Sequence, residues 1–214
     1  MPYITESLKN YFILLAFFLL IEMLIYFSCR RKGIPVSKSF LLGWQVFACL
    51  MTAIFTITGI AGLDDLLRYG TAMVNPEQIN LIPFHWYADN FYNLIMNVIL
   101  FLPIGLILPL LWKSGTSFGK TVCSGFFLSL LIEISQLFSY RATDIDDLLM
   151  NTLGTVIGYT FYFIFLRKYC VFQTDNRSRS LLSRNSALGH ILVIFLFYFC
   201  IGGPFLNFIY RIIR

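Results

Sequence analysis

Six long apolar runs constrain the fold of this 214-residue chain more than any other feature. They cover residues 11–27, 40–63, 91–112, 121–140, 148–166 and 188–210, and short polar segments join them. A helix needs about 20 mainly apolar residues to cross the hydrocarbon core of a bilayer, and it satisfies its own backbone hydrogen bonds there. The sequence therefore predicts an all-α fold, a polytopic transmembrane helical bundle of about six spans that forms a single membrane domain over residues 1–214.

The composition excludes an ordinary soluble domain. Only 13% of the residues are charged and 58% are hydrophobic, whereas about a quarter of the residues of a soluble domain are charged. The net charge of +5 does not indicate nucleic-acid binding, because the basic residues cluster beside the apolar runs. The five cysteines are odd in number and lack ligand spacing, so we expect buried apolar thiols, no disulfide, no metal site and no cofactor.

The basic residues also predict an orientation in the membrane. Of the 16 Lys and Arg residues, the segments 28–39, 113–120 and 167–187 hold four, two and five. Lys and Arg concentrate in cytoplasmic connections, so we expect 167–187 to be a basic cytoplasmic loop and both termini to lie outside. The connection 64–90 then also lies outside, and its opening sequence LDDLLRYG predicts a short interfacial helix.

A polar stretch begins inside the fourth apolar run. Glu133 lies within that run, Gln136 shares its helix face, and Arg141 is the nearest cation. A charged side chain costs roughly 2.5–3.5 kcal/mol at the centre of a membrane helix, so such a residue is a candidate for function. We interpret these residues as part of a ligand or proton site. The alternative is a structural hydrogen bond from Glu133 to Asn93 or Asn97.

The same polar stretch ends at the start of the fifth helix. Asp144, Asp147 and Asn151 are spaced i, i+3 and i+7 and share one face. We expect Asp146 to point away from that face. Capping by Thr143 or Asp144, with acids in the first turn, explains the carboxylates. Capping does not explain Asn151, so a shared polar pocket is the alternative interpretation of these residues. The spacing also suits Mg²⁺ or Ca²⁺, but it is too generic to predict a metal site.

Two further amides complete the predicted pocket. Asn93 and Asn97 lie four residues apart on one face of the third helix, and Gly154 and Gly158 form a GxxxG pair that allows a neighbouring helix to approach closely. We expect the third, fourth and fifth helices to converge around one outward-opening pocket. Its candidate ligand-binding residues are Asn93, Asn97, Glu133, Gln136, Arg141, Asp144, Asp147 and Asn151.

Four segments in the middle of the chain form a recognisable pattern. They are NLIPF at 80–84, NVILFLPIG at 97–105, SLLIEISQ at 129–136 and RATDIDDLLMNTLGTVIGY at 141–159. Together they resemble the VanZ-like family of bacterial membrane proteins, and they predict a VanZ-like core over residues 80–165, around the third to fifth helices. The resemblance implies a multi-pass protein of the bacterial plasma membrane. The family's namesake is linked to resistance to teicoplanin, a lipid-bearing glycopeptide that acts on cell-wall precursors, but the resemblance implies no known reaction.

Three functions remain open at this stage. The first is a protein that binds or shields an amphiphile among the membrane lipids, such as a lipid-linked cell-wall precursor or a lipoglycopeptide, with Arg141 as an anion partner. The second is an enzyme that acts on a lipid-linked substrate, with Glu133 or Asp147 as general base. The sequence shows no nucleophile arrangement and no phosphate-binding glycine loop, so it favours this reading less. The third is a proton-coupled transporter or flippase with Glu133 as the coupling group.

Overall fold

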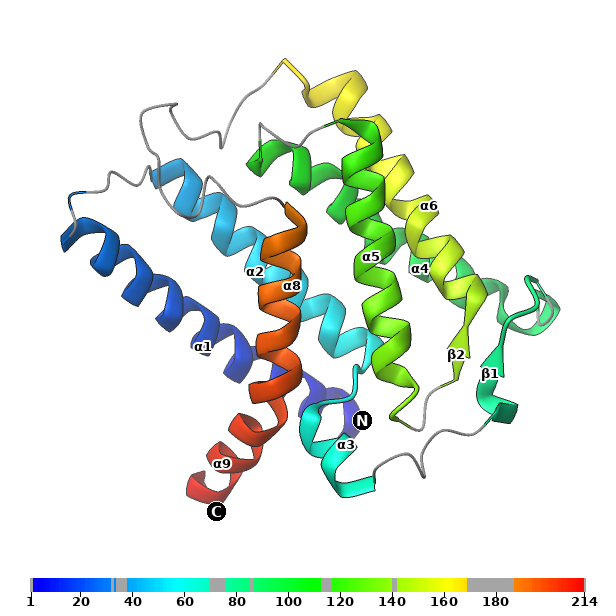
Figure 1. Ribbon diagram of the computed structural model, residues 1–214, viewed down its shortest axis with the longest axis horizontal. Coiled ribbons are helices and arrows are strands. Elements are labelled where there is room, and N and C mark those ends of the chain that lie inside the picture. Colours follow the sequence, from blue (N-terminus) through cyan, green and yellow to red (C-terminus); the bar gives the residue numbers. More distant parts are fainter. Residues whose placement is uncertain are drawn as a thin grey trace.

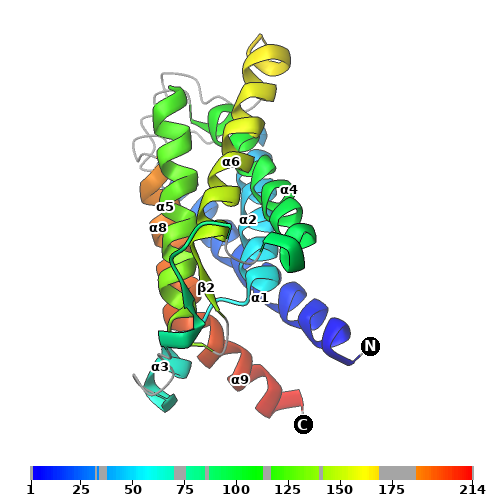
Figure 2. The same ribbon diagram turned by 90° about the vertical axis from the view of Figure 1, so that its right-hand side faces the viewer.

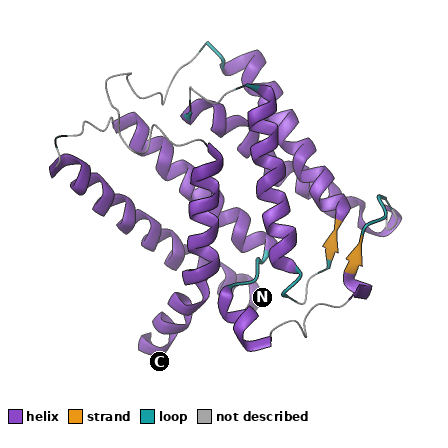
Figure 3. Ribbon diagram, in the orientation of Figure 1, coloured by secondary structure: helices purple, strands orange, loops and turns teal. Residues whose placement is uncertain are grey.

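A computed structural model describes residues 2–31, 33, 38–69, 76–84, 87–112, 117–139, 142–168 and 187–213. Nearly all of this structure is helical (Figures 1 and 3). The α-helices are α1 (Pro2–Arg31), α2 (Lys38–Thr58), α3 (Leu63–Tyr69), α4 (Tyr87–Leu111), α5 (Phe118–Gln136), α6 (Ile145–Phe161), α8 (Ala187–Phe197) and α9 (Gly203–Ile213). Two π-helical segments, Tyr162–Leu166 and Tyr198–Gly202, extend α6 and α8. A 3₁₀ turn, Pro76–Gln78, leads into the short strand β1 (Ile79–Asn80), and a second short strand, β2 (Thr143–Asp144), directly precedes α6.

The predicted helical bundle is confirmed. Within the described residues, six helical segments are long and apolar enough to cross a membrane: Lys9–Ser28, Leu41–Leu67, Phe91–Leu111, Phe118–Gln136, Ile145–Leu166 and Ala187–Leu206. The last segment stays helical across Gly202 and Gly203, and the path bends where α9 leaves α8 (Figures 1 and 2). The π-helical segment and Pro204 at this point are recognised causes of helix bending. The protein is therefore an all-α, multi-pass membrane protein.

Successive long helices run in opposite directions across the bundle. In Figure 1, α2, α5 and α8 begin toward the upper side, and α4 and α6 begin toward the lower side. Alternate connections therefore meet at the same end of the bundle, as the predicted topology requires. Helix α3 and the strand pair lie at the end where α2 and α5 terminate (Figure 1). This end contains the polar residues that the sequence singled out.

Helix α2 lies at the centre of the apolar core. Phe47, Met51, Ile54 and Phe55 of this helix are completely buried. They pack in one cluster with apolar side chains of α1, α4, α5 and α8. Exposed apolar side chains cover the outer surfaces of the same helices, which is the arrangement expected where helices contact lipid tails.

Helices α4 and α6 approach each other with their backbones in contact. A Cβ atom added at Gly154 would collide with the carbonyl oxygen of Val98, and one added at Gly158 would collide with that of Leu102. From the other side, a Cβ atom at Gly105 would collide with the backbone of Thr155. The GxxxG pair, Gly154 and Gly158, thus allows α6 to approach another helix closely, and that helix is α4, the third apolar run of the sequence.

Two details differ from the sequence-based expectation. The sequence predicted no strands, whereas β1 and β2 form a short parallel pair that joins Ile79 to Thr143 and Asn80 to Asp144 in register (Figure 3). The strand pair supplies hydrogen-bond partners for backbone N–H and C=O groups in the two connections that precede α4 and α6, where no helix supplies them. The expectation of buried thiols is wrong for Cys123 and Cys200, which are free and exposed. Both lie on membrane-spanning helices, where an exposed thiol can meet lipid.

Candidate functional site

A cavity of about 510 Å³ lies between the C-terminal ends of α2 and α5 and the N-terminal halves of α4 and α6. Its volume is within the range of small-molecule binding sites. Its polar lining residues are Thr58, Asn93, Asn97, Glu133, Gln136, Asp144, Asp146, Asp147 and Asn151. Seven of the eight residues predicted from the sequence therefore line one cavity. The eighth, Arg141, lies outside the described residues.

One face of α5 contacts α6 at three successive levels. Gly125 lies against the side chain of Thr155. One turn further, the Asn151 amide donates a hydrogen bond of 2.9 Å to the Ser129 hydroxyl. At the level of the cavity, the Glu133 carboxylate accepts a 3.1 Å hydrogen bond from the backbone N–H at the start of α6.

That N–H belongs to Asp144, so Glu133 helps to place the first residue of the α6 cap. The other buried amide of α5, Gln136, donates a 2.9 Å hydrogen bond to the carbonyl oxygen of Thr58 at the end of α2. Sequence reasoning could not find Thr58, because its backbone carbonyl makes the contact. On the opposite wall, the Asn97 amide of α4 donates to the Asp147 carboxylate of α6. Hydrogen bonds that side chains make with other side chains or with backbone atoms therefore connect the helices around the cavity.

The two remaining aspartates organise the connection that precedes α4. Asp144 is the N-cap of α6 and accepts a hydrogen bond from the Asp146 N–H at 2.9 Å. It also accepts a 3.0 Å hydrogen bond from the Asn80 amide, across the strand pair. The capping interpretation is therefore correct for Asp144. Asn80 itself was not a predicted site residue, although it begins the NLIPF segment.

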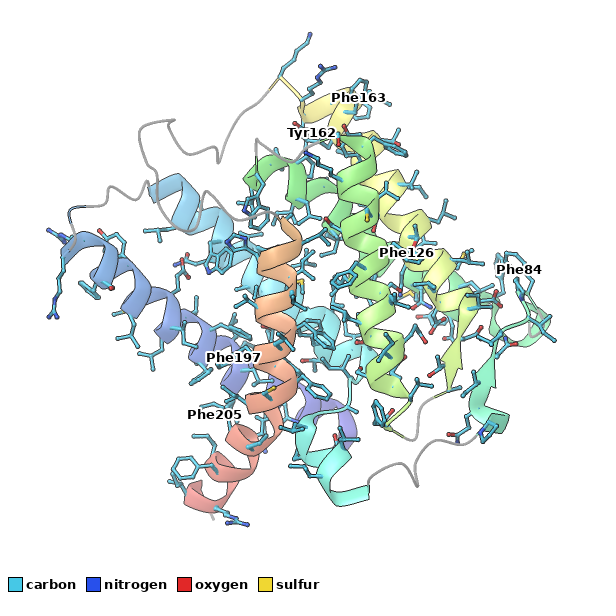
Figure 4. The ribbon with its side chains drawn as sticks, in the orientation of Figure 1. Phe84, Phe126, Tyr162, Phe163, Phe197 and Phe205 are labelled. Atoms are coloured by element: carbon cyan, nitrogen blue, oxygen red, sulfur yellow. The ribbon has the colours of Figure 1, made fainter. Side chains whose placement is uncertain are left out.

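Asp146 was expected to point away from the pocket, but it lines the cavity wall and is 3% exposed. Its two carboxylate oxygens accept hydrogen bonds of 2.8 and 3.0 Å from the Phe84 N–H. Phe84 has a left-handed backbone conformation, with φ of +58°, which is unfavourable for a residue with a side chain. The Phe84 ring lies in the loop beyond β1, at the edge of the molecule (Figure 4). Asp146 thus holds the strained turn that leads into α4.

Burial raises the pKa of the Asp144 carboxyl above its ordinary value. The Asp146 N–H hydrogen bond lowers this pKa, the charge of the Asp146 carboxylate raises it, and the Asn80 amide lowers it. The net direction is upward, because the loss of hydration outweighs the hydrogen bonds that favour the charged form.

Two buried oxygens in the cavity lining have no hydrogen-bond donor. They are the side-chain carbonyl oxygens of Gln136 and Asn151. These residues are only 4% and 2% exposed. The NH₂ group of each side chain donates a hydrogen bond to an atom of a neighbouring helix, so the oxygen of each side chain remains available as an acceptor. Buried acceptors without a partner are rare in folded proteins, and each requires an explanation.

One wall of the cavity is apolar and faces outward. Ile57 at the end of α2 and Tyr92 and Met96 on α4 line the cavity. They are 59%, 71% and 42% exposed. All three lie in or directly beside segments that are apolar enough to span a membrane. The cavity therefore has a polar interior and an apolar side that opens between α2 and α4.

Comparisons with known proteins cover the same region. The family described as VanZ/LLP1 matches residues 46–166. The chain is also similar to a protein named Protein VanZ from Enterococcus faecium, with 34% identity over 116 residues that cover 52% of this chain and 71% of that protein. No solved structure matches the chain with significance. All residues that line the cavity lie within the matched region.

Proposed function

This chain belongs to the VanZ/LLP1 family, and we propose that it binds the head of a membrane amphiphile in the polar cavity. The observation that carries this proposal is the combination of a cavity of about 510 Å³ with a polar interior and an exposed apolar side. A water-soluble ligand would need only the interior. An amphiphile uses both parts, because its head enters the interior while its tail remains beside Ile57 and Met96 in the lipid.

We place the cavity at the outer leaflet of the bacterial plasma membrane. The supporting feature is the charge distribution: eleven of the 16 Lys and Arg residues lie in the segments 28–39, 113–120 and 167–187, and such residues favour the cytoplasmic side. The described members of this set, at the end of α1, the starts of α2 and α5 and the end of α6, lie at helix ends opposite the cavity. Both termini are then outside. In this orientation the cavity reaches the leaflet in which lipid-linked cell-wall components are exposed.

Such components are the amphiphiles we propose as ligands. We propose that holding or shielding them lowers susceptibility to teicoplanin-type glycopeptides, the phenotype to which the family's namesake is linked. Arg141 directly precedes Ala142, a residue of the cavity lining. We propose that its guanidinium binds the anionic part of the ligand, since Arg pairs with phosphate through two parallel hydrogen bonds.

The test measures binding and susceptibility with the same variants. Purified full-length protein is titrated with a lipid-linked cell-wall precursor and with a lipoglycopeptide, and cells are profiled for glycopeptide susceptibility at matched expression. We expect Arg141→Ala and Glu133→Gln to weaken binding and to restore susceptibility. Lys9→Ala, far from the cavity in the sequence, serves as the control. Equal binding by wild type and Arg141→Ala would refute the role of Arg141.

The orientation is tested separately by cysteine labelling in a cysteine-free background. A membrane-impermeant reagent added outside should label a cysteine introduced at Asp89 or Thr143. The same reagent should not label a cysteine at Lys32 or Ser180. The reverse pattern would place the cavity on the cytoplasmic side and exclude a ligand in the outer leaflet.

A further inference from the structure

We infer that the interior of the cavity binds a primary ammonium group in the head of the amphiphile. The inference rests on the proposed function, because it names the chemistry of the head that enters this cavity. It is carried by the two buried oxygens without donors, by the carboxylates around them, and by the way in which the amide NH₂ groups of the site are used.

The two buried oxygens require a donor. The Gln136 and Asn151 side chains are more than nine-tenths buried, and the carbonyl oxygen of each lacks a partner. Their NH₂ groups are committed to the Thr58 carbonyl oxygen and the Ser129 hydroxyl. Turning the Gln136 amide around would lose its hydrogen bond, because the Thr58 carbonyl oxygen cannot donate, whereas the Ser129 hydroxyl can bond to either end of the Asn151 amide. A ligand with several N–H donors would satisfy them.

The electrostatic character of the lining selects a cation. Four carboxyl groups line the cavity, those of Glu133, Asp144, Asp146 and Asp147. The described lining contains no Lys, Arg or His. The NH₂ group of Asn97 also donates its hydrogen bond within the protein, to the Asp147 carboxylate. The described interior thus offers a ligand mainly acceptors and negative charge, which would repel a phosphate or carboxylate and attract an ammonium group.

Among possible cations, a primary ammonium fits these partners best. It carries three donors and no acceptor, whereas a quaternary ammonium carries no donor and a sugar hydroxyl carries no charge. Across the described residues, no three His, Cys, Asp or Glu side chains come together as a metal site. A lipid supplies the ammonium together with a tail, which suits the apolar side between α2 and α4.

Two phospholipids provide a matched test. Phosphatidylethanolamine and phosphatidylcholine share the phosphate and the acyl chains, and they differ only in three methyl groups on the nitrogen. The full-length protein is inserted into nanodiscs that contain equal parts of these two lipids and phosphatidylglycerol, and native mass spectrometry then identifies the lipids that stay bound after release. We expect phosphatidylethanolamine to be enriched at least about tenfold over phosphatidylcholine, as one or two charge-assisted hydrogen bonds require.

Variants connect this preference to the cavity. Asn151→Leu removes one unpartnered oxygen, and Asp147→Asn removes a charge while it keeps an oxygen that can accept from Asn97. Both should abolish the preference for phosphatidylethanolamine. Thr160→Val is the control, because the Thr160 hydroxyl is exposed and bonds only within its own helix, to Val156. Gln136→Leu replaces Asn151→Leu if the latter fails to fold, as judged by gel filtration.

The outcomes separate the two proposals. Equal retention of phosphatidylethanolamine and phosphatidylcholine would overturn the ammonium inference and leave amphiphile binding intact. Displacement of the bound lipid by Mg²⁺, or a preference for phosphatidylglycerol, would overturn the inference as well. Binding of soluble ethanolamine as strong as that of the lipid would keep the ammonium and refute the amphiphile. Retention of no lipid and no ethanolamine would refute both.

Discussion

Replacing Gly158 by alanine should push α4 and α6 apart seven residues beyond Asn151, the last α6 residue of the cavity lining. A Cβ atom at this position would lie 3.0 Å from the carbonyl carbon of Leu102 and closer still to its oxygen. Ordinary van der Waals contact begins at 3.4 Å. The helices must therefore separate by more than 0.4 Å, the difference between the 3.0 Å distance and ordinary contact at 3.4 Å. The atoms in the way belong to the backbone of Leu102, which cannot rotate away as a side chain can.

Overpacking of this kind costs about 1–3 kcal/mol in protein interiors. We expect Gly158→Ala to lower the free energy of unfolding by this amount, which is roughly a 5- to 150-fold lower ratio of folded to unfolded protein. The Asn97–Asp147 hydrogen bond crosses the same helix pair. Its lengthening should also weaken ligand binding.

Two other glycines supply graded controls. At Gly125 the nearest atoms all belong to the Thr155 side chain, so Gly125→Ala should cost less than Gly158→Ala. At Gly119 an added Cβ atom meets nothing within 4 Å. Gly119→Ala should therefore stay within about 1 kcal/mol of wild type, on the stabilising side, because alanine favours the helix.

Reversible unfolding in mixed micelles, followed by tryptophan fluorescence, measures all three variants. The expected order of stability is Gly119→Ala, Gly125→Ala, Gly158→Ala, from highest to lowest. If Gly158→Ala proved as stable as Gly119→Ala, the backbone contact between α4 and α6 would not exist as described.

Two further predictions concern the aspartates beside the cavity. Asp146→Ala should remove the carboxylate that accepts a hydrogen bond from the Phe84 N–H, at a cost of about 1–3 kcal/mol, and hydrogen exchange over residues 80–84 should accelerate. Asp146→Asn, which keeps one acceptor, should accelerate it less, and equal protection in all three proteins would contradict the role of Asp146. Because burial raises the pKa of Asp144, the folded protein binds more protons than the unfolded chain from pH 3.8, the ordinary value, up to the raised pKa. Stability should fall as the pH rises through that window. Asp144→Asn keeps the capping oxygen and should flatten this part of the unfolding profile; an unchanged profile would show that Asp144 does not cause it.

The sequence alone determined the class of fold, because each apolar run is long enough to cross a bilayer and a helix satisfies its own backbone there. This information is local, so the number of spans and the alternation of their directions follow without knowledge of packing. Helical spacing also placed Asp144, Asp147 and Asn151 on one face, and the GxxxG pair indicated a close helix contact. The predicted residues Glu133 and Gln136 are buried in the structure, as polar residues inside an apolar run require.

Only the tertiary structure decided which helices contact which residues. Spacing along a helix predicts a face but not its partner, so the partner of Gly158 on α4 and that of Glu133 at Asp144 could not be read from the sequence. Asp146 was misplaced for the same reason, since its partner Phe84 lies 62 residues earlier in the chain. The Gln136 and Asn151 oxygens lack a partner because the NH₂ groups of these side chains bind atoms of other helices, at Thr58 and Ser129, which the sequence did not identify as partners. The sequence thus established that a polar site exists inside an apolar bundle, and packing between distant segments determined that its interior accepts hydrogen bonds.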